Sequence, residues 1–137
     1  MMKGSPMPLV TIDVGPDRTG ELARSIADGV HYALVAAIGI PAGDRFQVIN
    51  RHGPGELVFD PDYLGIDRRD VVFVRITLVE GRSNERKKEL YRTIVTNLEA
   101  VGVRREDVVI SLTETGRIDW SIGNGVAQLV ETSPAST

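Results

Sequence analysis

Pro8 is the residue whose chemistry depends most on where the functional chain begins. It follows Met7 directly and opens the apolar run PLVTIDV. If translation begins at Met7 and the methionine is removed, Pro8 carries a secondary amine, and a terminal amine has a pKa of roughly 8. Such an amine is a base when neutral and an acid when protonated. If the preceding residues are retained, the Pro8 nitrogen is an amide without a proton, and Pro8 only opens a strand.

Two charged side chains stand at the ends of expected elements. Arg82 follows the apolar run 71–79 and directly precedes Ser83. It therefore belongs to the carboxyl end of a strand, where α/β folds tend to bind ligands. The alternative is a solvated arginine that pairs with Glu85. Asp44 opens a strand after a helix stop and is first interpreted as a turn carboxylate.

Trp120 is the only tryptophan and lies in the segment DWSIGNG, after the last expected strand. A single tryptophan is most often a core residue, but this segment can reach a neighbouring subunit and place the indole in a shared pocket wall. His31 and His52 have no paired acidic cluster, and the chain has no cysteine. The sequence therefore predicts no metal site and no thiolate chemistry.

The composition is typical of a soluble cytoplasmic protein with one domain. Sixteen Lys and Arg against nineteen Asp and Glu give a net charge of −3 over 137 residues. This balance gives no electrostatic reason to expect nucleic acid or an anionic membrane as a partner. No apolar run approaches the ~20 residues that a membrane span needs. The segment MMKGSPM lacks the apolar stretch of a secretory signal.

The first half of the chain contains one strand–helix–strand pattern. Apolar residues alternate along 8–14, as in a strand, and then recur every four residues from Leu22 to Ile38, as on one face of a helix. Thr19 is a suitable N-cap for this helix and Gly39 a suitable stop. The segment RFQVIN follows and is expected to form a second strand.

The second half of the chain repeats this order. The nearly continuous apolar run 71–79 predicts a strand covered on both sides, and a helix capped by Ser83 follows until Gly102. The segment DVVISLTE then supplies another strand. Thr19 lies sixty-four residues before Ser83, as expected for a tandem duplication. The duplication predicts that strand 9–14 is an inner strand paired with 71–79.

Two such units with right-handed crossovers predict an α+β fold, a four-stranded mixed sheet with both helices on one face. The repeat units span about residues 8–50 and 71–115, and the connector between them is expected to hold a short hairpin at Pro54–Gly55. The other face of the sheet would remain uncovered. An uncovered face of this size predicts association with copies of the same chain.

Five segments follow in order over most of the chain: MPLVTIDV, GIPAGDRFQVI, ITLVEGRSNERKKELY, EDVVISLTE and DWSIGNG. Through these five segments, the chain from Pro8 to about Glu131 resembles the tautomerase superfamily, whose hallmark is an amino-terminal proline on duplicated β-α-β units. Within it, the chain is most similar to the malonate semialdehyde decarboxylase-like group. The resemblance implies a homotrimeric, cofactor-independent isomerase with no metal, in which Pro8 is the general base or acid.

The resemblance also implies roles for other site residues. Arg82 would be the arginine that binds a substrate carboxylate, Asp44 an acid that orients water or the substrate carbonyl, and Trp120 part of the substrate-binding wall. The characterised decarboxylases resemble RPR at the turn where this chain has EGR, so Glu80 replaces an arginine. A negative charge there weakens the case for a second carboxylate anchor and favours a cationic Pro8 if it points inward.

Three functions follow from these residues. The first is keto–enol tautomerisation of a small carboxylated enol or α-keto acid. The second is decarboxylation of a β-keto acid, as in the malonate semialdehyde decarboxylases. The third is a catalytically inactive trimeric relative, if Pro8 is not amino-terminal. We expect residues 1–7 to be an N-terminal extension or an expression remnant, 8–131 to form the tautomerase-like domain, and 132–137 to be a flexible tail.

Overall fold

The computed structural model of the protein describes residues 7–131, so most of the predicted extension (residues 1–6) and the whole predicted tail (132–137) lie outside the described residues. The strands are β1 (Leu9–Val14), β2 (Phe46–Arg51), β3 (Val72–Val79) and β4 (Val108–Thr115). The helices are α1 (Gly20–Ile38), α2 (Asn84–Glu99) and the short α3 (Gln128–Glu131), with 3-10 turns η1 (Tyr63–Gly65), η2 (Arg105–Asp107) and η3 (Arg117–Asp119).

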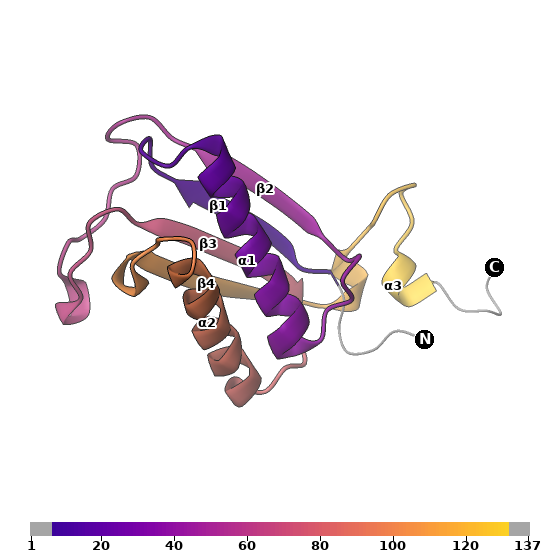
Figure 1. Cartoon of the computed structure of the whole chain (residues 1–137). Coiled ribbons are helices and arrows are strands. Elements are labelled where there is room, and N and C mark those ends of the chain that lie inside the picture. Colours follow the sequence, from indigo (N-terminus) through magenta and orange to yellow (C-terminus); the bar gives the residue numbers. More distant parts are fainter. Residues whose placement is uncertain (1–6, 132–137) are drawn as a thin grey trace.

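The four strands form one mixed sheet in the order β2-β1-β3-β4. β1 runs parallel to β2 and antiparallel to β3, and β3 runs parallel to β4. Figure 1 shows α1 and α2 side by side on one face of this sheet. The predicted α+β fold is confirmed, including the inner position of β1 next to β3.

Both long helices begin at the predicted N-caps and α1 ends at the predicted Gly39, whereas α2 ends at Glu99, before the predicted stop at Gly102. The Thr19 hydroxyl accepts a hydrogen bond from the Leu22 amide at 3.1 Å, and the Ser83 hydroxyl accepts one from the Arg86 amide at 3.2 Å. Gly39 adopts a left-handed conformation with φ of 71° at the end of α1. Because only glycine adopts this conformation without steric cost, α1 ends there.

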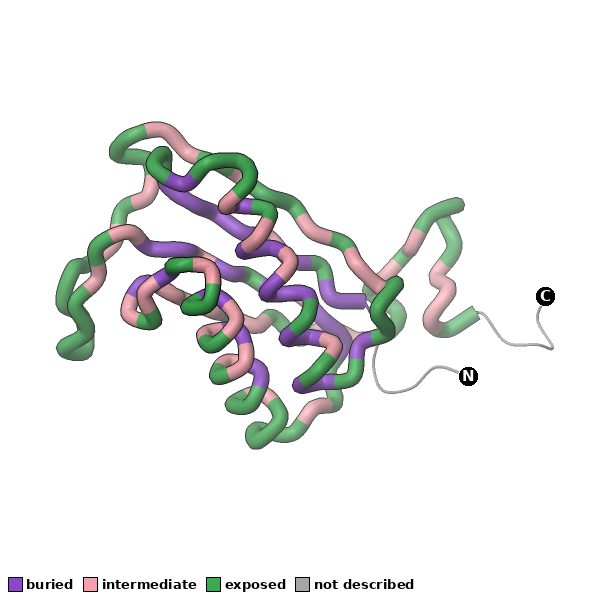
Figure 2. Tube along the Cα trace, in the orientation of Figure 1, coloured by how far each residue is buried: buried purple, intermediate pink, exposed green. Residues whose placement is uncertain are grey.

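The core lies between the sheet and the two helices. Figure 2 shows the buried residues on the facing sides of α1, α2 and the two central strands. Val10, Ile12 and Val14 of β1 are almost fully buried, as the predicted alternation requires. Each large aliphatic side chain buried in this way contributes about 1.5–3 kcal/mol to folding. The helix layer therefore fixes β1, and with it the position of Pro8.

The opposite face of the sheet carries no helix among the described residues. Its apolar side chains are partly exposed: Leu9 is 40%, Phe46 44% and Val48 47% accessible. In the register of β1 and β2, Leu9 lies beside Phe46 and Thr11 beside Val48. The prediction of an uncovered sheet face is confirmed for the single chain.

A buried carboxylate, Asp13, lies on this open face. It accepts hydrogen bonds from His52 at 2.7 Å, Arg75 at 3.1 Å and Asn50 at 3.2 Å. Burial would raise the pKa of Asp13, but these hydrogen bonds outweigh it and hold the pKa below its usual value. Asp13 therefore ties β1 to β2 and β3 rather than remaining available for catalysis.

The predicted hairpin at Pro54–Gly55 is wrong. The chain makes a turn there, with the Glu56 amide donating to the Gly53 carbonyl at 3.2 Å, but β2 ends before it at Arg51 and the next strand in the described chain is β3, which does not pair with β2. The Glu56 side chain accepts from the Gly53 amide at 2.6 Å. A side-chain acceptor satisfies this backbone group locally, so no cross-strand partner is needed.

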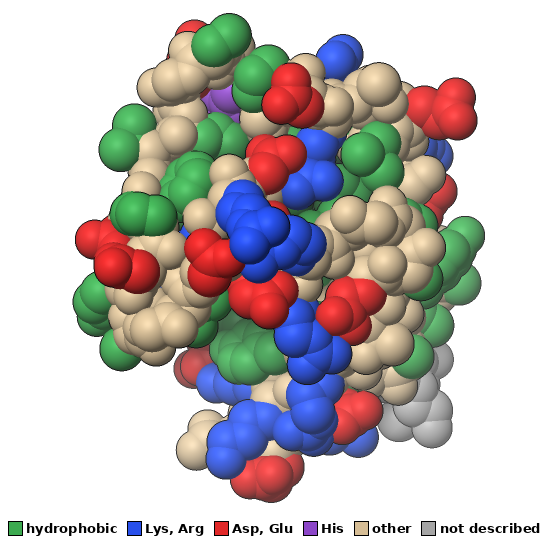
Figure 3. All heavy atoms as spheres, turned by 60° about the vertical axis from the view of Figure 1, so that its left-hand side comes forward, with side chains coloured by type: hydrophobic (Ala, Val, Ile, Leu, Met, Phe, Trp, Pro, Cys, Tyr) green, Lys and Arg blue, Asp and Glu red, His purple; other side chains and the backbone are tan. Residues whose placement is uncertain are grey.

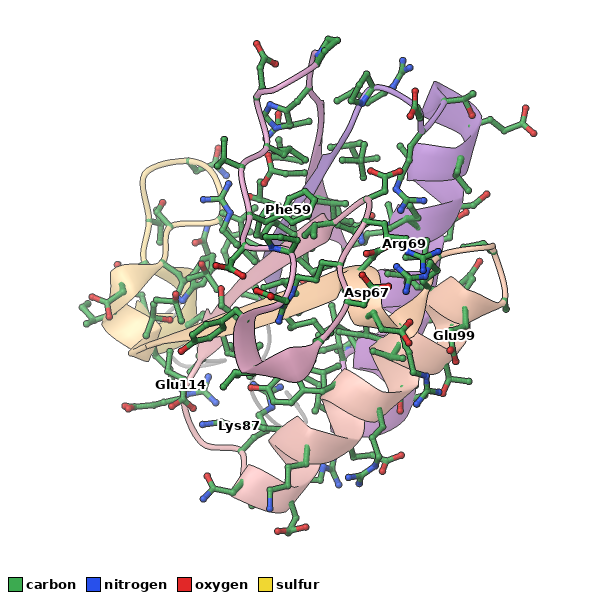
Figure 4. The ribbon with its side chains drawn as sticks, turned by 90° about the vertical axis from the view of Figure 1, so that its left-hand side faces the viewer. Phe59, Asp67, Arg69, Lys87, Glu99 and Glu114 are labelled. Carbon is green, nitrogen blue, oxygen red and sulfur yellow. The ribbon has the colours of Figure 1, made fainter. Side chains whose placement is uncertain are left out.

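The connector and the helices carry charges of both signs at the surface. Figure 3 shows basic and acidic side chains interspersed on one side of the molecule. Figure 4 labels Asp67 and Arg69, which form an ion pair at 3.0 Å. Within residues 7–131, no helix is long and apolar enough to cross a membrane.

Candidate active site

The strand register brings the beginning of β1 to the other candidate residues. Leu9 pairs with Phe46 of β2 and with Thr77 of β3. Counting back from these pairs places Met7 level with Asp44 and Val79, and Pro8 one residue further along, level with Arg45 and Leu78. Figure 1 shows that the segment after β4 projects from this same end of the sheet. The candidate residues therefore gather where β1 begins and β3 ends.

Asp44 contacts the backbone immediately before Pro8. The Met7 amide donates to Asp44 Oδ2 at 2.8 Å, and Met7 is only 6% exposed. The three bonds from the Met7 nitrogen to the Pro8 nitrogen sum to about 4.3 Å, so the Pro8 nitrogen lies within roughly 7 Å of this carboxylate oxygen. Met7 also has a φ of 63°, which is uncommon for a residue other than glycine.

The second oxygen of the same carboxylate, Asp44 Oδ1, is buried and accepts no hydrogen bond from any residue between 7 and 131. A buried carboxylate oxygen without a donor is costly, and sites that bind a ligand are where such groups are retained. The geometry is suited to an N–H or O–H group placed beside Pro8.

A buried histidine holds the loop that carries Asp44. His31 of α1 is 5% exposed, and its Nε2 lies 2.8 Å from the carbonyl oxygen of Ala42. Because a carbonyl only accepts, His31 Nε2 must be the donor. The Asp44 amide in turn donates to the Pro41 carbonyl at 2.9 Å. The sequence indicated no role for His31, because the partner is a backbone atom eleven residues away.

Arg82 lies at the end of β3, as predicted. Its guanidinium NH1 donates to the Val79 carbonyl at 3.0 Å, and the side chain is half-buried. Burial lowers the pKa of Arg82, and the charge of Arg86 lowers it further, whereas Glu114 and Asp44 act in the opposite direction. Arginine begins from so high a pKa that it remains a cation at neutral pH.

A second ion pair lies next to Arg82. Lys87 of α2 and Glu114 of β4 are joined at 3.0 Å, and Figure 4 shows the two side chains pointing toward one another. Glu114 is also one of the carboxylates whose charge raises the pKa of Arg82. From the sequence, Lys87 was predicted only as part of the helix that follows Arg82.

Trp120 is half-buried and anchored through a threonine. Its indole Nε1 donates to Thr115 Oγ1 at 2.7 Å, and this hydroxyl lies 2.9 Å from the Leu78 carbonyl. The indole is thus tied to the end of β3, close to where Arg82 is tied to the next carbonyl. Thr115 was not among the predicted site residues, because a threonine at the end of a strand carries no signal of its own.

Glu80 is the last of the predicted site residues. It is exposed in the turn between β3 and α2, and its backbone amide donates to the Thr115 carbonyl at 2.8 Å. The arrangement as a whole joins a half-buried acid close to Pro8, a cation at the end of the neighbouring strand and an aromatic side chain. Such a set can hold a small carboxylate next to a group that transfers protons.

Comparison with known proteins agrees with this geometry. Two family models, both described as tautomerase enzyme, match residues 44–123 and 8–66. The probable tautomerase YusQ of Bacillus subtilis (strain 168) is 37% identical over 127 residues, which are 91% of this chain and all of that protein. The probable tautomerase YrdN of the same organism is 29% identical over 125 residues, covering 90% and 97% of the two chains.

Solved structures give the same result. The crystal structure of FG41 malonate semialdehyde decarboxylase inhibited by 3-bromopropiolate is 41% identical, with a TM-score of 0.85 over 89% of this chain and 94% of that chain. A second malonate semialdehyde decarboxylase is 35% identical, with a TM-score of 0.82 over 89% and 95%. With two family models and a relative matched over its whole length in agreement, this chain belongs to the tautomerase family and is an enzyme of the tautomerase, or isomerase, type.

Proposed function

We propose that this enzyme is a cofactor-independent keto–enol tautomerase of small carboxylated enols or α-keto acids, acting through an amino-terminal Pro8. The observation that carries the proposal is the position of Asp44, which contacts the backbone directly before Pro8 and has a buried oxygen without a partner. A terminal ammonium at Pro8 would supply the missing N–H donor. The nearby carboxylate would in turn favour the cationic form of the amine.

The proposed reaction needs one group that moves a proton between oxygen and carbon. Cationic Pro8 would donate a proton to the carbon as the C=C bond becomes C–C, and the neutral amine that this leaves would accept the enolic O–H proton as the C–O bond becomes C=O. Atoms and charge balance without any other reactant. Pro8 is suited to this because an amine with a pKa near neutrality works in both directions.

Arg82 and Trp120 would bind the substrate beside Pro8. A planar guanidinium can hold a carboxylate with two parallel hydrogen bonds, which fixes the plane of a keto acid. The indole of Trp120 would cover the apolar part of the substrate. Asp44 would hold a water that donates to the oxygen without a partner in the described chain, and this water could also donate to the substrate carbonyl.

Decarboxylation is the second candidate. It is favoured by the 41% identity to the FG41 malonate semialdehyde decarboxylase. Against it stands Glu80, which occupies the turn where we expect an arginine in the decarboxylases. A carboxylate there cannot anchor a second substrate carboxylate. The third candidate, an inactive relative, requires that Pro8 stay acylated.

We expect the chain that begins at Pro8 to ketonise the enol of phenylpyruvate well above the uncatalysed rate. Loss of the enol absorbance measures this reaction. In the same preparation, CO₂ release from malonate semialdehyde should be the slower reaction, because Glu80 removes an anchor. Faster CO₂ release than ketonisation would favour the decarboxylase. Neither activity in a chain of confirmed mass would favour the inactive relative.

We also propose that the protein is a homotrimer whose subunits cover one another's open sheet faces. The partly exposed Leu9, Phe46 and Val48 support this, since such a face is unfavourable in water. A structure with the same fold, 18% identical with a TM-score of 0.73, is described as a symmetric trimer of fused 4-OT. The segment that holds Trp120 projects beyond the sheet and would contribute to a pocket between subunits.

Sedimentation at micromolar concentration should report three chains of 14.9 kDa each. Val48→Lys places a charge on the open face and should shift the protein toward monomer, with loss of ketonisation if the pocket is shared. Tyr32→Lys, at a residue of α1 that is 61% exposed, is the matched control and should remain trimeric. A stable wild-type monomer would contradict both the covered face and the shared pocket.

A further inference from the structure

The hydroxyl of Thr115 makes two hydrogen bonds that join Trp120 to the sheet. Trp120 Nε1 can only donate and the Leu78 carbonyl can only accept. The hydroxyl must therefore accept from the indole at 2.7 Å and donate to the carbonyl at 2.9 Å. One side chain thus satisfies both neighbours at once, and no other side chain among residues 7–131 bonds to the indole nitrogen.

The anchor lies at the end of the sheet where the candidate site forms. Thr115 is the last residue of β4 and pairs with Val79 of β3. The Val79 carbonyl accepts from Arg82, and the preceding carbonyl, that of Leu78, accepts from Thr115. Arg82 and Trp120 are therefore fastened to neighbouring peptide groups of one strand. A shift of the indole relative to this strand would change its distance to Arg82.

The strand pair itself does not depend on the hydroxyl. The Thr115 carbonyl accepts from the Glu80 amide at 2.8 Å through the backbone alone. The turn after β4 is closed by a different contact, in which the Gly116 amide donates to Asp119 at 2.7 Å. Removal of the hydroxyl should therefore leave β4 and its turn in place and release only the indole.

We infer that Thr115 is a positioning residue, which holds the Trp120 indole in the orientation that forms a wall of the substrate site. The inference rests on the proposed function in so far as Trp120 contacts the substrate. The inference goes beyond the proposed function because it assigns a role to Thr115, a residue that acts through Trp120 and not on the reacting atoms. Thr115 should thus govern substrate binding more than the rate of proton transfer.

The experiment compares Thr115→Val, which keeps the shape of the side chain, with Thr115→Ser, which keeps the hydroxyl. Thr113→Val is the matched control, because Thr113 lies two residues earlier on the same open face of β4, so it tests the loss of a hydroxyl from this face without loss of the Trp120 hydrogen bond. Since Trp120 is the only tryptophan, its fluorescence reports the indole directly. The second readout is KM and kcat for phenylpyruvate enol in the enzyme with a free Pro8 amine.

For Thr115→Val we expect red-shifted emission, easier quenching by acrylamide and a KM about 5- to 10-fold higher with little change in kcat, as for the loss of one hydrogen bond. Thr115→Ser and Thr113→Val should resemble the wild type in both readouts. Unchanged fluorescence in a folded Thr115→Val would overturn the inference. Changed fluorescence with unchanged KM would also overturn it, while leaving the proposed function intact.

Trp120→Phe keeps the inference testable if Thr115→Val fails to fold. It removes the indole N–H and leaves Thr115 in place, so KM should rise to a similar extent. Where Thr115→Val does fold, its effect and that of Trp120→Phe should not add in the double variant, because both remove the same hydrogen bond. Additive effects would contradict the inference. A wild-type enzyme without ketonisation activity would count against the proposed function. The fluorescence comparison would then still test whether Thr115 anchors the Trp120 indole.

Discussion

A chain that begins at Pro8 should ketonise phenylpyruvate enol, and the full 137-residue chain should be slower by about 100-fold or more. General acid–base groups typically contribute about 10²- to 10⁴-fold to a rate, and acylation removes the group entirely. The short chain is obtained by starting translation at Met7 in a host that removes methionine before proline. The enol absorbance gives the rate, and the intact mass of each protein identifies its first residue.

The structure gives two physical reasons for this expectation. With Met7 in place, the Pro8 nitrogen is an amide that can neither accept nor donate the proton. Met7 also occupies the site itself, since its side chain is buried and its amide uses Asp44 Oδ2 as acceptor at 2.8 Å. In the short chain, the same carboxylate would face the Pro8 amine.

A variant of the full chain separates these two reasons. Met7→Gly suits the φ of 63° and removes the buried side chain, but it leaves the Pro8 nitrogen acylated. It should therefore remain as inactive as the full wild-type chain. Recovery of activity in Met7→Gly would mean that Met7 blocks the site by its bulk. Equal activity of the short and full wild-type chains would show that Pro8 only opens a strand.

Arg82→Ala should lower kcat/KM for phenylpyruvate enol by roughly ten- to more than a hundredfold. Loss of a hydrogen-bonded contact to a charged group costs about 1.5–3 kcal/mol. Arg82 is half-buried, so solvent replaces the lost contact only in part. Arg82→Lys should lie between the wild type and alanine, because an ammonium keeps the charge but cannot form two parallel bonds.

Two comparisons distinguish substrate binding from a structural role of Arg82. Arg92→Ala removes an exposed cation of α2, which pairs with Glu89 at 2.7 Å. This substitution should leave the kinetics unchanged. An enol with the same ring but no carboxylate should lose little rate on Arg82→Ala. An equal loss for both enols would mean that Arg82 supports the turn after Val79 and does not bind the carboxylate.

Much of the fold could be predicted because its signals are local. Alternating and four-residue apolar spacings identified all four strands and both long helices, and Thr19, Gly39 and Ser83 marked helix ends correctly. These features depend on residues close in the chain. The connector was predicted less well. Pro54–Gly55 does form a turn, but a hairpin also needs a second strand, and this depends on pairing partners farther away in the chain. Here the Glu56 side chain, and not a second strand, accepts the hydrogen bond from the Gly53 amide.

The candidate site was predicted in its residue types, through a family resemblance, rather than in its contacts. Neither periodicity nor spacing indicated that the Met7 amide would lie 2.8 Å from Asp44, thirty-seven residues away. The role of His31 beneath that loop was missed for the same reason. Thr115 was missed because its importance comes from its partners and not from its residue type.

The sequence by itself determined the elements, their caps, the duplication and the residue types that could bind and protonate a small acid, because short-range spacing encodes them. The tertiary structure alone decided which of these residues meet. The pairing of Leu9 with both Phe46 and Thr77 sets Pro8 close to Asp44 and the end of β3, and the pairing of Val79 with Thr115 anchors the indole there. Strand register is a long-range property, set by which side chains pack together in the core, so the site exists only once the sheet has formed.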